Sequence, residues 1–151
     1  MKTSNLPNSQ HTLLLVEDTL TEVQIVQRAM KGLARPVHLC VVRDGQEAMD
    51  YLLGQGAYAA KKAPRPHLVL LDLNLPRLTG LEVLGQMREH ADLCSVPVVL
   101  WSTSRKPEDI RAGYLAGANT FFEKPRDFQR LCDLLDGVLK YWFESALLPP
   151  P

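Results

Sequence analysis

The stretch His67-Leu-Val-Leu-Leu-Asp72 decides the fold of this chain. A short apolar run that ends in a carboxylate is typical of a strand covered on both faces, whose carboxyl end reaches a polar edge. Similar runs lie on both sides of it, so that the sequence predicts five strands, at residues 12–16, 37–42, 67–71, 96–101 and 120–122. They are nearly continuous in apolar character rather than alternating, which favours a parallel sheet.

Segments with helical spacing follow each of these runs, at residues 20–33, 45–53, 80–89, 107–116 and 127–147. Capping-box patterns precede three of them: Thr19 with Glu22, Thr79 with Glu82, and the variant Asp44 with Glu47. Five strand–helix units in succession predict an α/β fold with a parallel five-stranded sheet between two layers of helices.

Composition narrows the class of protein. The chain has 151 residues, 46% of them hydrophobic, with 17 basic and 17 acidic side chains, which suits one domain and argues against a dedicated nucleic-acid binder. No apolar run could span a bilayer, and residues 1–10 contain no signal-peptide core. Cys40, Cys94 and Cys132 are odd in number and widely spaced, so we expect neither a disulfide framework nor a zinc site. We therefore expect a soluble cytoplasmic domain.

Polar groups follow four of the five predicted strands. Glu17 and Asp18 follow the first strand, Asp72 the third, Ser102 the fourth and Lys124 the fifth. Ligands of open parallel sheets bind beyond the carboxyl ends of the strands, so these groups are expected to share one edge.

Phosphoryl transfer to a carboxylate is the chemistry that this set suits. Clustered carboxylates repel one another and need a cation, and oxygen ligands with few protein donors suit Mg²⁺. One carboxylate can then attack a phosphorylated donor and form an aspartyl phosphate. Asp72 is the best candidate because it ends the central strand, while Lys124 and Ser102 would bind the phosphoryl oxygens.

With these residues, the chain resembles the receiver domain of two-component response regulators. The matching pattern is Leu-Leu-Val-Glu17-Asp18, then Leu-Leu-Asp72-Leu-Asn74-Leu-Pro76-x-x-x-Gly80, Ser102-Thr103 and Lys124-Pro125, over about residues 11–140. The resemblance implies a doubly wound, flavodoxin-like sandwich with strand order 2-1-3-4-5. It also implies one receiver domain over residues 1–151, with residues 141–151 as a C-terminal arm.

The resemblance assigns roles to the site residues. Asp72 is the phosphoacceptor, and Mg²⁺ is held by Glu17, Asp18, Asp72 and the main-chain carbonyl of Asn74. Lys124 and Ser102 contact the phosphoryl group, and the bond from Lys124 to its proline is expected to be cis.

The resemblance also implies a conformational switch and residues that control the lifetime of the aspartyl phosphate. Ser102 moves toward the phosphoryl group, Phe121 turns inward behind it, and the surface of the fourth helix, fifth strand and fifth helix changes. Asn74 and Ser104 lie where the family tunes dephosphorylation. Trp101 stands where an aliphatic residue is more usual, and the sequence does not indicate its orientation.

The long connection at residues 54–66 and the aromatic C-terminus are similar to those of small response regulators paired with bacterial phytochromes, which are light-sensing histidine kinases. This likeness implies a histidine kinase, specifically a bacteriophytochrome, as partner, without nucleic acid or membrane. It also implies a homodimer in which the C-terminal arm and the face from the fourth to the fifth helix take part. The arm residues expected at the dimer contact are Tyr141, Trp142, Phe143, Leu147 and Leu148. The alternative for the tail is that it folds back on its own domain.

Two other function classes fit this sequence less well. A pseudo-receiver that only binds or dimerises does not need all five site groups. A dehalogenase-type phosphatase needs a second aspartate at position 74, where Asn74 stands, and a flavodoxin-like carrier would meet repulsion between Glu17-Asp18 and the phosphate of its cofactor. No dinucleotide or P-loop motif occurs, so we expect a signalling protein and not an enzyme.

Overall fold

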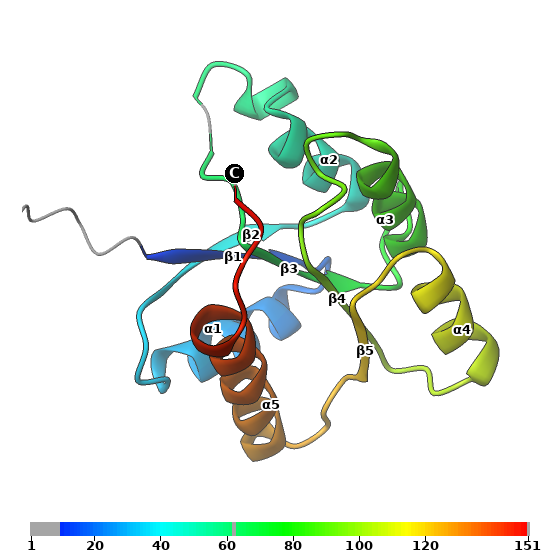
Figure 1. Cartoon of the computed structure of the whole chain (residues 1–151). Helices are drawn as coiled ribbons and strands as arrows, with labels where there is room; N and C mark the ends of the chain where they lie inside the picture. Colours follow the sequence, from blue (N-terminus) through cyan, green and yellow to red (C-terminus); the bar gives the residue numbers. More distant parts are fainter. Residues whose placement is uncertain (1–9, 62, 151) are drawn as a thin grey trace, which may run out of the picture.

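The computed structural model describes residues 10–61 and 63–150 (Figure 1). Within these ranges, no helix has the length and apolar character that crossing a membrane requires. The expectations for the N-terminal segment fall almost entirely on residues 1–9, outside the described residues. All three cysteines are free thiols, as expected.

The sheet has five parallel strands in the order β2-β1-β3-β4-β5, which confirms the predicted fold class and strand order. Their bounds differ from the predicted ones by at most two residues: β1 His11–Val16, β2 Val37–Val42, β3 Leu68–Asp72, β4 Val98–Ser102 and β5 Thr120–Glu123. Every residue of β3 and β4 is buried, because these strands lie inside the sheet and are covered on both faces.

Two helical layers cover the sheet (Figure 1). Helices α1 and α5 lie on one face, and α2, α3 and α4 lie on the other. The helix bounds are α1 Leu20–Lys31, α2 Gly45–Leu53, α3 Gly80–Glu89, α4 Pro107–Leu115 and α5 Phe128–Lys140, with a short 3-10 turn at Gly56–Tyr58.

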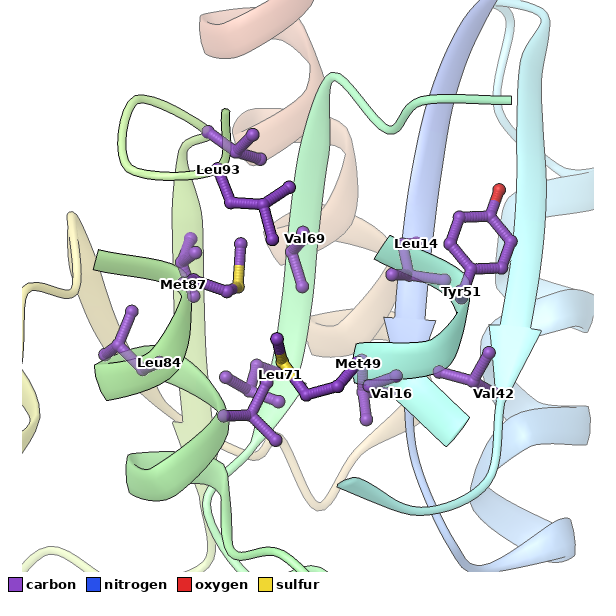
Figure 2. Packing of buried hydrophobic residues seen from close by; sticks show 14 of the residues in the cluster. Leu14, Val16, Val42, Met49, Tyr51, Val69, Leu71, Leu84, Met87 and Leu93 are labelled. Atoms are coloured by element: carbon purple, nitrogen blue, oxygen red, sulfur yellow. The ribbon is translucent and has the colours of Figure 1, made fainter. Parts of the chain in front are cut away.

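Each face has its own apolar core. On the α2–α3 side, Met49 and Met87 pack against Leu71 at the centre of the sheet (Figure 2). On the other side, Val26 and Leu135 pack against alternate residues of the same strands. Successive strand residues point to opposite faces, so a continuous apolar run fills both cores at once.

Two of the three predicted helix caps are present. Thr79 and Glu82 form a reciprocal capping box at α3, and Asp44 accepts a hydrogen bond of 2.7 Å from the backbone of Glu47. The third prediction is wrong, because Thr19 makes no side-chain cap at α1. The Glu22 side chain that would complete that box is bound elsewhere, as described below.

The predicted helix over residues 127–147 is too long. Helix α5 ends at Lys140, and a π-helical turn follows over Tyr141–Ser145, closed by a hydrogen bond of 2.7 Å from the Ala146 amide to the Tyr141 carbonyl. The wider turn lets Trp142 and Phe143 pack against the α1–α5 core.

The connection at residues 54–66 is held by side chains. The Tyr51 hydroxyl donates to the Pro64 carbonyl over 2.7 Å, and the Tyr58 hydroxyl donates to Glu47 over 3.0 Å. Arg65 binds the carbonyl of Asp92 in the α3–β4 connection. These bonds fasten the connection to α2 and to the α3–β4 segment.

Gly80 begins α3 directly beneath the end of β3. A Cβ there would overlap the Asp72 carbonyl oxygen and lie 2.8 Å from the Leu73 Cα. Because these backbone atoms cannot move aside without disturbing β3, we expect Gly80→Ala to lower the free energy of unfolding by about 1–3 kcal/mol. Gly85→Ala, in the same helix with open space around it, should raise that energy by up to about 1 kcal/mol.

Chemical denaturation of both variants checks this expectation. Equal stability of the two variants would contradict the close approach of α3 to β3.

Candidate phosphoacceptor site

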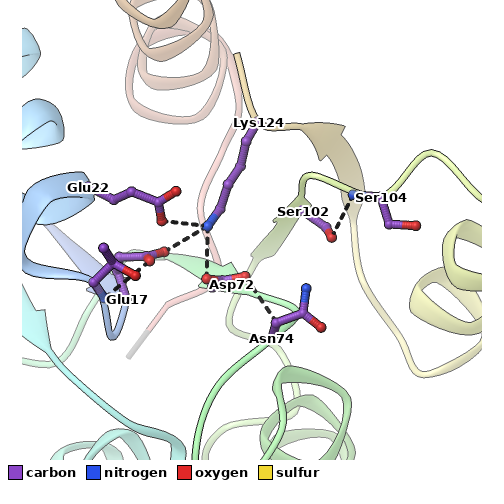
Figure 3. A network of polar contacts seen from close by, with 8 residues as sticks. Glu17, Glu22, Asp72, Asn74, Ser102, Ser104 and Lys124 are labelled. Carbon is purple, nitrogen blue, oxygen red and sulfur yellow. Dashed lines mark hydrogen bonds and ion pairs between the residues drawn. The ribbon is translucent and has the colours of Figure 1, made fainter. Parts of the chain in front are cut away.

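The carboxyl ends of the strands bring the predicted polar groups to one edge of the sheet (Figure 3). Asp72 is the last residue of β3, Glu17 follows β1, and Lys124 follows β5. Backbone bonds fix these ends: the Glu17 amide donates to Val42 over 3.0 Å, and the Lys124 amide donates to Ser102 over 2.8 Å. The side chains are thus placed by the sheet itself.

The Lys124 ammonium is the centre of the site. Its Nζ lies 2.8 Å from Asp72 Oδ2, 3.1 Å from Glu17 Oε2 and 2.7 Å from Glu22 Oε2 (Figure 3). An ammonium has three donors, and each one here has a carboxylate acceptor. One cation therefore neutralises part of the charge of three acidic groups.

Burial makes this arrangement electrostatically costly. Glu17 is fully buried, and desolvation, followed by hydrogen bonding with Glu22 and Asp72, raises the pKa of its carboxyl group to about 9. Burial alone would lower the pKa of Lys124, but its contacts with Asp72 and Glu22 raise it above the ordinary value. The site thus favours positive charge, as a divalent cation would supply.

Three carboxylate oxygens, from Glu17, Glu22 and Asp72, all lie within 4.8 Å of one another. Hard oxygen ligands of this kind fit Mg²⁺ or Mn²⁺. The donor set of the site is therefore compatible with a divalent cation.

Asp18 and Glu22 depart from the sequence-based picture. Asp18 is exposed and is not one of the three convergent carboxylates, while its carbonyl accepts a bond of 2.7 Å from Arg43. Glu22 was assigned only to a helix cap, yet it binds Lys124. Its position in the first turn of the helix that follows the first strand was the available signal.

Ser102 is buried at the end of β4, and its hydroxyl accepts a bond of 3.0 Å from the Ser104 amide. The Ser104 hydroxyl in turn donates to Asp109 in the first turn of α4. On the other side of the site, the backbone N–H of Asn74 donates to Asp72 Oδ1 over 3.0 Å. A chain of hydrogen bonds therefore runs from the Ser102 hydroxyl through Ser104 to α4.

Phe121 and Trp101 lie on opposite faces of the sheet. Phe121 is half-buried and faces Gly113 of α4, and its amide donates to the Tyr114 hydroxyl over 3.2 Å. Trp101 is buried in the α1–α5 core, with its ring centre 5.6 Å from Lys124 Nζ. Its orientation, undetermined from the sequence, is thus fixed beside the site.

The peptide bond between Lys124 and Pro125 is trans, so the expectation of a cis bond is wrong. The trans form is the intrinsically favoured one before proline, by about 0.5–1 kcal/mol. Lys124 reaches Asp72 in this conformation.

Residues 13–136 match the response regulator receiver domain family, over most of the chain and all four strand ends that carry the site. The chain belongs to this family. Receiver domains are signalling domains, and the fold seen here is theirs.

Relatives of known structure place the chain near the phytochrome-associated receiver domains. Response regulator Rcp1 of Synechocystis sp. is 37% identical over 146 residues, which cover 97% of this chain and 98% of that protein. The phosphorylated cyanobacterial phytochrome response regulator RcpA superposes with a TM-score of 0.87 at 37% identity, over 94% of this chain and 100% of RcpA. The Mn²⁺-bound form of Rcp1 gives a TM-score of 0.83, over 93% and 99% of the two chains.

Lys124→Met would leave the receiver site without its internal cation. Because unpaired charges would then remain buried, we expect a loss of about 2–4 kcal/mol in the free energy of unfolding without divalent cations. Added Mg²⁺ should restore more stability in this variant than in the wild type, since binding to the folded state stabilises it.

Thermal unfolding with and without Mg²⁺ measures both effects, with Lys140→Met on the exposed side of α5 as the control. A Lys124→Met variant that behaves like this control would contradict the central role of the ammonium.

Proposed function

We propose that this receiver domain accepts a phosphoryl group on Asp72 from a histidine kinase. The single observation that carries the proposal is the contact of 2.8 Å between Asp72 and the Lys124 ammonium at the carboxyl edge of the sheet. One Asp72 oxygen is the nucleophile, and Lys124 stabilises the negative charge on the phosphoryl oxygens during transfer.

The reaction depends on Mg²⁺ in this proposal. Glu17, Asp18, Asp72 and the main-chain carbonyl of Asn74 would hold the ion, and Asp18 turns inward to do so. Bound Mg²⁺ supplies charge neutralisation and orients the phosphoryl group. Support comes from the convergence of acidic oxygens here and from the relative whose structure contains Mn²⁺.

The signal leaves the site through a switch. Ser102 donates a hydrogen bond to the phosphoryl group, Phe121 moves toward the space that this opens, and the α4-β5-α5 surface changes. The bond from Ser104 to Asp109 already links the segment that follows β4 to α4. Asn74 and Ser104 flank the acceptor and tune the lifetime of the aspartyl phosphate.

A phytochrome-type light sensor is the proposed kinase. The support is the likeness along nearly the whole chain to RcpA, described as a phytochrome response regulator, and to Rcp1. The alternative function is a non-phosphorylated pseudo-receiver that acts as a binding or dimerisation module. The complete charged site argues against it, because a binding module gains nothing from burying these carboxylates.

Phosphorylation is tested by intact mass spectrometry after incubation with Mg²⁺ and acetyl phosphate. We expect a single base-labile phosphoryl adduct on the wild type, none without Mg²⁺, and none on Asp72→Asn, which removes the nucleophile but keeps the shape. Asp44→Asn, at the cap of α2, is the control and should be modified like the wild type.

An adduct that persists in Asp72→Asn would move the acceptor elsewhere. Absence of any adduct from acetyl phosphate and from a phosphorylated histidine kinase would favour the binding module.

We also propose that the chain forms a homodimer through β5, α5 and the C-terminal arm. Phe122, Leu134 and Val138 line an open apolar hollow of about 430 Å³ beside Tyr141 and Trp142. Of the arm residues, Tyr141 is 57% exposed and Leu147 is 99% exposed, whereas Trp142, Phe143 and Leu148 are half-buried.

Tyr141→Ser and Leu147→Ser should therefore shift the chain toward monomer in sedimentation experiments, because they remove apolar contact area. Leu53→Ser, also an exposed apolar position but on α2 at the opposite face of the sheet, is the control. Unchanged association in both arm variants would contradict the arm's part in the dimer.

A further inference from the structure

Glu22 has no part in the proposed transfer, yet it makes the shortest of the three carboxylate contacts to Lys124. Its Oε2 lies 2.7 Å from Lys124 Nζ, compared with 2.8 Å for Asp72 and 3.1 Å for Glu17 (Figure 3). The side chain comes from α1, outside the sheet that supplies the other partners. A separate element therefore holds the lysine from one side.

The number of donors limits what Lys124 can bind. All three hydrogens of the ammonium are directed to carboxylates. A phosphoryl oxygen can gain a bond from Lys124 only if one of these partners loses it. The Glu17 and Asp72 side chains are 0% and 5% exposed and sit in the floor of the site, whereas that of Glu22 is 36% exposed. Glu22 is the partner that water can replace at least cost.

The start of α1 shows a second consequence of this pairing. Thr19 and Glu22 have the sequence of a capping box, but no side chain caps the helix. At α3 the equivalent pair, Thr79 and Glu82, forms the complete box. The carboxylate of Glu22 is engaged by Lys124 in place of the backbone of its own helix.

We propose that Glu22 is a positioning residue that holds Lys124 in the unphosphorylated protein and competes with the phosphoryl group for it. The inference rests on the proposed function of Asp72. Glu22 raises the affinity for the cation, because it adds a negative charge within 4.8 Å of the other acidic oxygens. It lowers the affinity for the phosphoryl group, because it occupies a donor and repels the anion.

Two affinities should thus move in opposite directions in Glu22→Gln. We expect the Kd for Mg²⁺ alone to rise roughly threefold to tenfold, as for the loss of one partly exposed charge partner. At saturating Mg²⁺, the Kd for beryllofluoride, a phosphoryl mimic that bonds to a carboxylate, should fall by a similar factor. A mere loss of packing would weaken the binding of both ligands. Shifts of the two Kd values in opposite directions therefore identify the positioning role.

Isothermal titration calorimetry of the full chain measures both constants. Glu89→Gln, an exposed position on α3 with the same change in charge, is the matched control. Glu22→Asp keeps the charge but withdraws the carboxylate from Lys124, so its Kd for Mg²⁺ should lie between those of the wild type and Glu22→Gln, and it should bind beryllofluoride more tightly than the wild type.

The outcomes separate the two proposals. Wild type that binds Mg²⁺ but no beryllofluoride would overturn the function proposed for Asp72. Beryllofluoride binding by the wild type, with equal affinities in Glu22→Gln and Glu89→Gln, would overturn the role of Glu22 alone. Weaker binding of both ligands in Glu22→Gln would also overturn it.

Discussion

The rest of the structure depends on one ammonium group held among buried carboxylates. Glu17 and Asp72 are buried in the floor of the site at the ends of two largely apolar strands, so negative charge there needs a partner within the protein. Lys124, which follows β5, provides it across the carboxyl edge of the sheet. The ion pair between Lys124 and Asp72 offsets the cost of burying the carboxylate. It also makes Asp72 a suitable acceptor, because an incoming phosphoryl group meets a cation that is already in place.

The opposite edge of the molecule holds the C-terminal arm. Phe143 stacks on His11, the first residue of β1, with ring centres 4.5 Å apart, and Glu144 pairs with Arg35 over 2.8 Å. The acceptor site begins where β1 ends, at Glu17. The arm and the site are therefore joined by the length of one central strand, and α5 runs from the site to the arm (Figure 1). A signal formed at the acceptor has a packed route to the surface proposed for dimerisation.

The sequence predicted the strands and the site best where an apolar run and the polar residue at its end pointed to the same structure. Continuous apolar runs that end in Asp72 and Ser102 predicted both the buried strands and the edge at which the polar groups meet. Glu22 was missed because a capping box and a lysine partner require the same residue type at the same place, and only the fold brings Lys124 near. The end of α5 was missed because Tyr141, Trp142 and Phe143 continue a helical pattern, while the stacking on His11 that accompanies the π-helical turn comes from a distant strand.

The most direct test of the account is a crystal structure of the full chain with Mg²⁺ and beryllofluoride. The account predicts beryllium bonded to an Asp72 oxygen, Lys124 Nζ within hydrogen-bond distance of a fluorine, and the Ser102 hydroxyl turned toward the same group. Beryllofluoride bonded to another carboxylate, or bound to Asp72 with Lys124 still directed to Glu17 and Glu22, would contradict it.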